Sequence, residues 1–180
     1  MSSEPRLICL LGAECTGKTT LAQALAQRMG GLWVPEYLRR FTDLHGRTPE
    51  RHEQLSVLKK HEDLEAAALE TARSQSRAWV FCDTAPLMTA IYSDHVFGDA
   101  SLFPQAQRLH ARYALTLLLE PDIPWVADGI QRDGLAQRAA VHARIERALT
   151  ERAWPHVRMS GTLEDRLIAA EKAVLVINKL

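Results

Sequence analysis

The sequence predicts an α/β fold in which a five-stranded parallel sheet carries helices on both of its faces. Three observations support this prediction. Short apolar segments alternate along the chain with longer segments of helical periodicity, which is typical of parallel sheets with helical crossovers. Residues 78–82, Ala-Trp-Val-Phe-Cys, are apolar throughout, as expected for a strand that is buried on both faces. Gly or Pro ends several of these segments, where the chain must turn.

The same patterns give the order of the elements. We expect strands at 7–11, 32–34, 78–82, 115–119 and 157–159. We expect helices over 21–29, 49–73, 85–96, 103–113 and 138–152, and a last one from 162 onward. Pro49 is expected at the first helical position of its helix, and Thr162 is expected to cap the last one. The strand at 78–82 should lie beside the first strand, with 32–34 one place further out.

A phosphate-binding motif follows the first strand. Residues 12–19 read Gly-Ala-Glu-Cys-Thr-Gly-Lys-Thr and match G-x-x-x-x-G-K-[ST] between a strand and a helix, the context that this motif requires. The loop amides would bind phosphate oxygens, Lys18 would reach the outer phosphates and the Thr19 hydroxyl would bind Mg²⁺. The fold is therefore predicted to be that of a P-loop NTPase that binds a nucleoside triphosphate and Mg²⁺; ATP as that triphosphate is what the family resemblance described below implies. The predicted ATP-binding residues are Gly12, Ala13, Glu14, Cys15, Thr16, Gly17, Lys18, Thr19 and Thr20.

The composition argues against several classes of protein. The 180 residues fit one domain, predicted over 1–180, and are 47% hydrophobic and 24% charged. A net charge of zero does not indicate a nucleic acid or an anionic membrane as partner, and no apolar stretch approaches the length of a membrane span. Residues 1–5 do not resemble a signal peptide, so we expect a cytoplasmic protein.

The cysteines also favour a reducing compartment. They are odd in number and lack C-x-x-C spacing, which fits neither a disulfide framework nor a zinc site. Cys9 and Cys82 fall in apolar strand patterns and are expected in the core. Cys15 lies on the phosphate loop near a helix N-terminus, so it is either a reactive thiol or an inert packing residue.

Carboxylates follow two of the predicted strands. Ligands of open parallel sheets bind outside the carboxyl ends of the strands, which makes Glu36, after 32–34, and Asp83, after 78–82, candidate site residues. A carboxylate that ends an apolar strand is costly without a partner. For Asp83 the partner is either the hydrated Mg²⁺ of a P-loop protein or the amides of the next helix, which it would cap.

Several segments together resemble a known family. These are the phosphate loop, Pro-Glu-Tyr-x-x-Arg at 35–40, Phe-Cys-Asp-Thr at 81–84 and, most selectively, Pro-Trp-Val-Ala-Asp-Gly at 124–129. In this order they resemble the ribosylnicotinamide kinase domain of the bifunctional NadR proteins and the stand-alone NadR-like kinases. The resemblance implies a nucleoside-kinase-like fold. It also implies transfer of the γ-phosphoryl group of ATP to the 5′-hydroxyl of nicotinamide riboside, a small nucleoside, giving nicotinamide mononucleotide in NAD salvage.

The resemblance also implies roles for individual residues. Lys18 and Thr19 take the ATP and Mg²⁺ roles, while Glu36 and Asp83 face the acceptor hydroxyl or, through water, the metal. Of these two assignments we favour Asp83 for the metal and Glu36 for the hydroxyl. A lid segment around 121–138 would cover the phosphates. The catalytic candidates implied by the resemblance are Lys18, Glu36, Asp83 and Arg132.

The remaining candidates belong to the lid and the acceptor site. Either Gln131 or Arg132 matches the lid Arg of the family. Trp125 and Asp128 would lie beside the substrate. Tyr37 and Trp125 are either packing residues or neighbours of the flat cationic pyridinium ring of the substrate, and Arg39 is either solvated or in contact with the ligand. The predicted substrate-binding residues are Glu36, Tyr37, Arg39, Trp125 and Asp128.

Two alternatives remain open at the level of sequence. NadR kinases carry a second acid at the position of Ala85, so an acceptor other than nicotinamide riboside, either another nucleoside or a small alcohol, is one alternative. A regulatory nucleotide switch is the other. A guanine switch would need an N-K-x-D motif, and the only Asn of the chain is Asn178. The chain also lacks an H-x-G-H adenylyltransferase motif, and the sequence does not indicate an oligomeric state.

Overall fold

The structure is a computed structural model, and it describes residues 4–124 and 134–177. Its strands form one parallel five-stranded sheet in the order β2-β3-β1-β4-β5. The strands are β1 (Arg6–Leu11), β2 (Leu32–Val34), β3 (Trp79–Asp83), β4 (Leu115–Leu119) and β5 (His156–Met159). The predicted fold class is therefore confirmed, and so is the prediction that β3 lies next to β1 with β2 one place further out.

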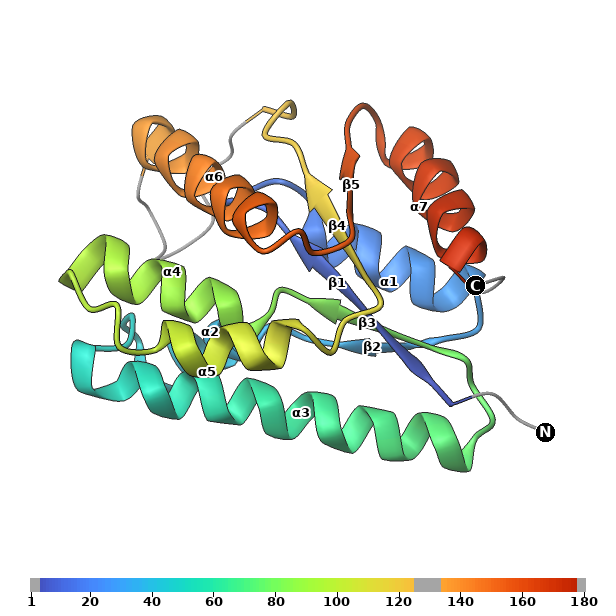
Figure 1. The fold of residues 1–180 in the computed structure, drawn as a ribbon, viewed down its shortest axis with the longest axis horizontal. Coiled ribbons are helices and arrows are strands. Elements are labelled where there is room, and N and C mark those ends of the chain that lie inside the picture. The colour runs from blue at the N-terminus through green and yellow to red at the C-terminus, as the bar shows by residue number, and fades with distance from the viewer. Residues whose placement is uncertain (1–3, 125–133, 178–180) are drawn as a thin grey trace.

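Helices cover both faces of the sheet (Figure 1). They are α1 (Lys18–Arg28), α2 (Tyr37–His45), α3 (Gln54–Ser74), α4 (Pro86–Phe97), α5 (Phe103–His110), α6 (Gly134–Glu151) and α7 (Leu163–Ile177). Helices α1 and α7 pack on one face, and α3, α4, α5 and α6 pack on the other. None of the helices in the described part of the chain combines the length and the apolarity that a membrane crossing needs.

Strand β1 shows why both faces must be covered. Leu7, Cys9 and Leu11 belong to the core cluster beneath α3 to α6, while Ile8 and Leu10 belong to the cluster beneath α1 and α7. Successive side chains of a strand point to opposite faces, so an uninterrupted apolar strand is stable only between two layers. The central position of β1 holds its carboxyl end, where the phosphate loop begins, inside a fully packed sheet.

Cys9 and Cys82 lie opposite each other in the register of β1 and β3. Both thiols are free and fully buried, which confirms the prediction that they belong to the core. Burial raises the pKa of both thiols well above the ordinary value, because the thiolate loses its hydration in the core. These two residues therefore act as small apolar side chains rather than as nucleophiles.

The structure departs from the predicted elements between β2 and α3. Helix α2 was not predicted, because it is short and mostly polar and buries only Phe41 and Thr42. Pro49 is not the first residue of a helix. The chain instead enters a 3-10 turn at Arg51–Glu53, which is capped by Glu50 and Glu53 in a capping box and continues directly into α3. The hydrogen bonds between carboxylates and backbone amides in this capping box start the helical segment, which is the role that we predicted for Pro49.

The boundaries of the other helices shift by a few residues. Helix α6 starts at Gly134 rather than at 138, and α5 ends at His110 rather than at 113. The predicted cap of α7 is confirmed, because Thr162 Oγ1 accepts a hydrogen bond from Asp165 N at 3.2 Å. In return, Thr162 N donates to Asp165 Oδ2 at 3.0 Å. These reciprocal bonds fix the entry of α7 at the carboxyl end of β5.

Candidate functional site

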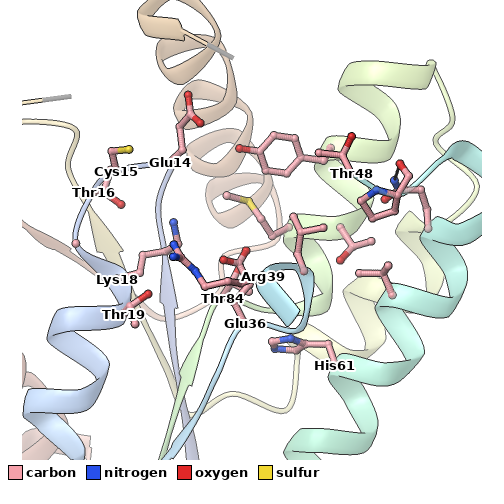
Figure 2. Close-up of a pocket in the computed structure, with 18 of the residues that line it drawn as sticks. Glu14, Cys15, Thr16, Lys18, Thr19, Glu36, Arg39, Thr48, His61 and Thr84 are labelled. Carbon is pink, nitrogen blue, oxygen red and sulfur yellow. Dashed lines mark hydrogen bonds between the residues drawn. The ribbon is translucent and has the colours of Figure 1, made fainter. Parts of the chain in front are cut away.

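A cleft of about 750 Å³ opens at the carboxyl edge of the sheet. One side is the phosphate loop with the first turn of α1, from Glu14 to Thr20, and the other side is formed by α2, α3 and α4. Figure 2 shows Lys18, Glu36 and Arg39 gathered in the middle of the cleft, with His61 reaching in from α3. One continuous hollow therefore lies where several predicted site residues follow the strands, and its volume is large enough for a nucleotide and a small acceptor.

Two glycines of the phosphate loop are required by geometry. A Cβ on Gly12 would lie 2.7 Å from Thr16 Oγ1 and 3.0 Å from the Leu119 carbonyl oxygen, so a side chain has no space there. Gly17 has a φ of 82°, a left-handed conformation that favours glycine, immediately before α1. The loop therefore turns tightly over the end of β4 and directs its amides toward the helix N-terminus.

Lys18 closes this loop in the structure. Its Nζ donates to the Gly12 carbonyl at 3.0 Å and to the Ala13 carbonyl at 2.9 Å. Thr16 Oγ1 also donates to the Ala13 carbonyl, at 2.8 Å. The ammonium group thus lies against the backbone of the loop and lines the cleft, so it is placed to meet a phosphate there.

Thr19 and Asp83 meet at the metal position that the motif predicts. Thr19 Oγ1 donates to Asp83 Oδ2 at 2.6 Å, and the Asp83 side chain is only 1% exposed. The other carboxylate oxygen, Oδ1, is buried without a hydrogen-bond partner in the described structure. A hydroxyl next to a buried carboxylate with unused acceptor capacity fits the donor set of a hydrated Mg²⁺.

The alternative role of Asp83 as a helix cap is wrong. The N-cap of α4 is Ala85, and no side chain caps that helix. Pro86 follows Ala85 in the first turn, where the fixed φ of proline suits the start of a helix. The Asp83 carboxylate instead points to the Thr19 hydroxyl, on the side of the phosphate loop.

Thr84, the last residue of the Phe-Cys-Asp-Thr segment, lines the cleft, although we predicted no role for it. Its φ of 72° is unusual for a β-branched residue, and its amide is held by the Leu10 carbonyl at 3.0 Å. The Thr84 hydroxyl is buried and unpaired in the described part of the chain, although the residue lines the cleft. Strained backbone of this kind is concentrated at functional sites. The sequence does not reveal the positive φ of Thr84, because threonine rarely has such a backbone conformation.

Glu36 lines the cleft at the junction of β2 and α2. It is the N-cap residue of α2 by position, but its side chain does not cap the helix. Its pKa is raised above the ordinary value, chiefly because burial removes water from the carboxylate and also because the charge of Asp83 is near. Lys18, His61 and Arg39 act in the opposite direction on this pKa and do not cancel the rise. A carboxylate with a raised pKa is a better proton acceptor at neutral pH than an ordinary one.

The other predicted acceptor residues have different outcomes. Arg39 lines the cleft, whereas Tyr37 is not among the residues that line it. Cys15 is partly exposed on the cleft wall, and neither of its two predicted roles is tested. Trp125, Asp128, Gln131 and Arg132 lie outside the described residues, as does much of the segment 121–138. Their roles stay predictions.

His61 is a second residue that the sequence analysis did not single out. It lines the cleft but is only 3% exposed, and its Nε2 lies 3.3 Å from Glu65 Oε1 one helical turn away. Glu65 is fully buried and also accepts a hydrogen bond from Arg112 Nη2 at 2.7 Å and one from the Tyr113 hydroxyl. This buried network fixes the cleft wall formed by α3. The signal was the spacing of His61 and Glu65 by four residues on one helix.

Apolar and aromatic side chains form much of the remaining wall, together with Pro49 and the polar Gln23, Thr48, Gln54 and Thr89. The apolar and aromatic side chains are Trp33, Leu38, Val57, Met88, Tyr92, Val96 and Phe97. Except for Trp33, which is on β2 and alternates to the face covered by α1, these residues belong to α2, α3 and α4, opposite the polar phosphate loop. Such a division is suited to a ligand with an anionic part and a flat or apolar part.

The matching family agrees with this geometry. A family model described as AAA domain matches residues 7–166, which include the phosphate loop, Asp83 and most of the sheet. The chain belongs to this AAA domain family. The match covers well over half of the sequence, so the loop and the strands around it are recognised together rather than as an isolated motif.

The AAA domain is also similar to curated proteins and solved structures. It is 31% identical over 129 residues to the trifunctional NAD biosynthesis/regulator protein NadR of Escherichia coli (strain K12). That match covers 72% of this chain and 32% of NadR, so the chain spans about a third of the length of the relative. The predicted resemblance to NadR is confirmed.

Structural comparison again finds NadR, and it also finds a thymidylate kinase. NadR in complex with NAD and AMP-PNP superimposes with a TM-score of 0.78 at 19% identity, covering 98% of this chain and 50% of that one. NadR in complex with NR gives 0.76 at 21% identity, covering 98% and 52%. Thymidylate kinase from Ehrlichia chaffeensis gives 0.68 at 16% identity, covering 96% and 100%. At these identities the likeness shows that the AAA domain has a P-loop kinase-like fold.

Proposed function

We propose that this chain is an ATP-dependent kinase that phosphorylates the 5′-hydroxyl of nicotinamide riboside to give nicotinamide mononucleotide. The observation that carries the proposal is the shared cleft, in which Lys18 of the phosphate loop and the Glu36 carboxylate face the same space. The similarity to NadR, whose name states NAD biosynthesis and one of whose structures holds NR, supports this choice of acceptor. The structure of NadR with AMP-PNP supports ATP as the donor.

The residues of the cleft are proposed to have different roles in phosphoryl transfer. The reaction demands mainly positioning and stabilisation of charge on the transferred group. The loop amides and Lys18 would hold the phosphates of ATP at one end. Glu36 would orient the acceptor hydroxyl and accept its proton, a role that suits a carboxylate whose pKa is raised by burial. Arg132 is proposed to add positive charge over the phosphates from the lid segment around 121–138.

Thr19 and Asp83 would hold Mg²⁺, Asp83 through water. The unpaired Oδ1 of Asp83 and the Thr19 hydroxyl are the donors available for it. When bound, Mg²⁺ would supply positive charge that stabilises the negative charge developing on the transferred phosphoryl group.

The apolar end of the cleft is proposed to hold the nicotinamide ring. Tyr92 and Phe97 of α4 supply aromatic surface there, and Arg39 also lines the cleft. A cationic pyridinium is attracted to aromatic faces, so this wall suits the base of nicotinamide riboside. Trp125, Asp128 and Tyr37 remain proposed substrate contacts on the strength of the NadR resemblance alone.

The proposal extends to the setting of the protein. We propose that residues 1–180 form a single domain, which acts on a small nucleoside and has no nucleic-acid partner. A cytoplasmic location is also proposed, and it is supported by the free, buried thiols of Cys9 and Cys82.

One experiment tests the acceptor directly. The purified protein is incubated with Mg²⁺, with ATP or GTP, and with a panel that contains nicotinamide riboside, the common nucleosides and small alcohols, and products are identified by mass. We expect a gain of one phosphoryl group on nicotinamide riboside with ATP. The Lys18→Ala variant serves as the control, because losing this cation should reduce transfer by about two to three orders of magnitude.

The same experiment separates the alternatives. Ala85 stands where NadR kinases carry a second acid, so a product formed only on another nucleoside or alcohol would replace nicotinamide riboside in the proposal and leave the kinase chemistry intact. ATP hydrolysis that no small acceptor stimulates would contradict the kinase and favour a regulatory nucleotide switch. Full activity of the Lys18→Ala variant would contradict the assignment of the phosphate site itself.

A further inference from the structure

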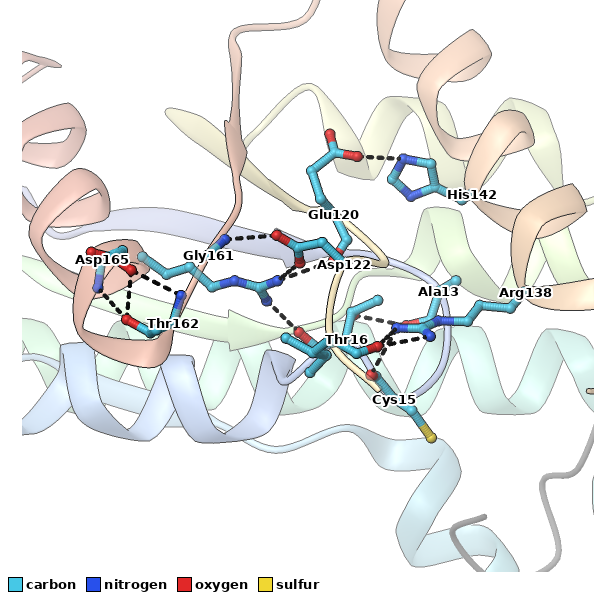
Figure 3. A network of polar contacts seen from close by, with 12 residues as sticks. Ala13, Cys15, Thr16, Glu120, Asp122, Arg138, His142, Gly161, Thr162 and Asp165 are labelled. Carbon is cyan, nitrogen blue, oxygen red and sulfur yellow. Dashed lines mark hydrogen bonds and ion pairs between the residues drawn. The ribbon is translucent and has the colours of Figure 1, made fainter. Parts of the chain in front are cut away.

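Two buried arginines contact the phosphate loop from outside the cleft. Arg138 of α6 is 5% exposed, and its Nη2 donates to the Cys15 carbonyl at 3.1 Å (Figure 3). Arg166 of α7 is 3% exposed, and its Nη1 donates to the Thr16 carbonyl at 2.6 Å. Neither arginine lines the cleft. Two helices that are distant in sequence therefore hold consecutive carbonyls of one loop.

The direction of a carbonyl determines the direction of the next amide. In a trans peptide the C=O and N–H bonds point in opposite directions, and the described backbone contains no cis peptide. Holding the Cys15 carbonyl on Arg138 therefore turns the Thr16 N–H away from α6, and holding the Thr16 carbonyl on Arg166 turns the Gly17 N–H away from α7. Both residues line the cleft, so these amides belong to the part of the loop that meets phosphate.

The same two guanidinium groups also hold the loop that follows β4. Arg138 donates from Nη1 and Nη2 to the Ile123 carbonyl, both at 3.1 Å. Arg166 donates to the Glu120 carbonyl at 3.1 Å and pairs with the Asp122 carboxylate. The phosphate loop and residues 120–123 are therefore joined through the arginines, and neither segment can shift without breaking bonds to them.

Arg138 carries a charge that the described residues do not neutralise. Its hydrogen-bond acceptors are carbonyl oxygens, and no described carboxylate lies within ion-pair distance of it. Its Nε is buried and has no partner among the residues that the structure covers. A buried guanidinium bonded only to neutral groups is costly and leaves a positive field at the loop. A bound polyphosphate would be stabilised by that field.

We propose that Arg138 and Arg166 are positioning residues of the triphosphate site. They fix the carbonyls of Cys15 and Thr16 so that the following amides are already directed at the phosphates before the nucleotide binds. Arg138 additionally supplies uncompensated positive charge behind the loop. The inference rests on the proposed function only in taking a nucleoside triphosphate as the ligand. It assigns neither arginine a contact with the nucleotide.

The test measures phosphate binding separately from the acceptor. Arg138→Gln, Arg138→Lys and Arg166→Gln are titrated calorimetrically with inorganic tripolyphosphate, with ATP and with nicotinamide riboside alone, and their Tm values are recorded. We expect both Gln variants to raise the Kd for tripolyphosphate and ATP at least about tenfold, which corresponds to about 1.4 kcal/mol. Binding of nicotinamide riboside should not change, and in turnover the KM for ATP should rise more than kcat falls.

Arg138→Lys keeps the charge but loses the planar fork that reaches two carbonyls at once, so its Kd should lie between wild type and Arg138→Gln. This variant also keeps the test decisive if a Gln variant fails to fold. Arg144→Gln is the matched control, because Arg144 lies on the same helix and pairs with Asp94 away from the loop. We expect its affinity for tripolyphosphate to equal that of wild type.

The inference fails if the Gln variants lose Tm but bind tripolyphosphate and ATP as wild type does, because the arginines would then only stabilise the fold. It also fails if Arg138→Lys and Arg144→Gln weaken binding equally. If wild-type protein binds neither tripolyphosphate nor ATP, the proposed kinase function fails instead. The two proposals are therefore distinguished by the wild-type titration.

Discussion

The Thr19 hydroxyl donates a hydrogen bond to Asp83 Oδ2 at 2.6 Å, although the two residues stand 64 positions apart in the chain. The parallel pairing of β1 with β3 brings them together, because Leu10 near the end of β1 is in register with Asp83. The phosphate loop begins at Gly12, two residues after Leu10. The bond therefore joins the phosphate-binding motif to the carboxylate of a neighbouring strand, and it is the structural basis of the metal assignment.

Asp83→Asn should weaken the response of the enzyme to Mg²⁺. The amide keeps the size of the side chain and can still contact Thr19, but it removes the negative charge that favours a divalent cation. We expect a higher Mg²⁺ concentration for half-maximal activity, with activity partly restored at high Mg²⁺. The measurement is a Mg²⁺ titration of turnover at saturating ATP. An unchanged Mg²⁺ titration curve would contradict the metal role of Asp83.

Glu36→Gln should reduce phosphoryl transfer and leave ATP binding close to wild type. The carboxylate lies in the cleft between Lys18 and the apolar wall, where it would face the acceptor rather than the phosphate loop. General-base contributions are commonly about 100-fold or more, so a loss of that order is expected in kcat. Calorimetric titration with ATP and Mg²⁺ is the control. If this variant loses nucleotide binding while Asp83→Asn keeps it, the two carboxylates have the opposite roles.

Glu36→Gln should also stabilise the protein at neutral pH. Because the pKa of Glu36 is raised in the folded state, chiefly by burial, the ionised carboxylate is less stable there than in the unfolded chain. The stabilisation that the protonated group gives is present below the ordinary pKa and is lost as the pH rises through the raised pKa. The Tm difference between the variant and wild type should therefore be largest at neutral pH and disappear below about pH 4. A variant less stable than wild type at pH 7 would contradict this linkage.

Glu65→Gln should destabilise the fold strongly. Glu65 is fully buried and pairs with Arg112 at 2.7 Å, with His61 Nε2 at 3.3 Å and with the Tyr113 hydroxyl. Removing one partner of a buried pair leaves the other charge poorly compensated, so we expect a loss of about 2–4 kcal/mol in the free energy of unfolding.

Urea denaturation measures this loss, and Glu70→Gln on the same helix is the control. Glu70 pairs with Arg73 at 3.1 Å on the exposed side of α3, where solvent screens the interaction, so no resolvable change is expected. Equal effects of the two substitutions would show that burial of Glu65 does not determine its contribution. In Glu65→Gln the KM for the acceptor should rise as well, because Glu65 holds His61 in the cleft wall.

The sequence predicted most of the sheet but less of what lies between its strands. The uninterrupted apolar strands could be read directly, because each is buried on both faces and shows little else in its pattern. Helix α2 was not predicted, because it is a short and mostly polar segment that buries only Phe41 and Thr42. Pro49 was misassigned because a capping box between Glu50 and Glu53 starts the following turn instead. Both errors lie in the short segment between β2 and α3, which is too brief to show a clear helical period before α3 begins.

The candidate site likewise has one part that could be predicted from the sequence and another that could not. The sequence by itself determined the phosphate loop, because the fixed spacing of Gly12, Gly17, Lys18 and Thr19 directly encodes the close turn and the helix N-terminus that phosphate needs. It also placed Glu36 and Asp83 at strand ends, because parallel strands end at one edge of a sheet.

Only the tertiary structure decided that Asp83 meets Thr19 instead of capping α4, that His61 lines the cleft, and that Arg138 and Arg166 hold the loop from behind. Each of these relationships joins segments that are brought together by packing on opposite faces of the sheet or across neighbouring strands. A buried arginine or histidine carries no local signal of its partner, since the carbonyl or carboxylate that compensates it belongs to a distant part of the chain.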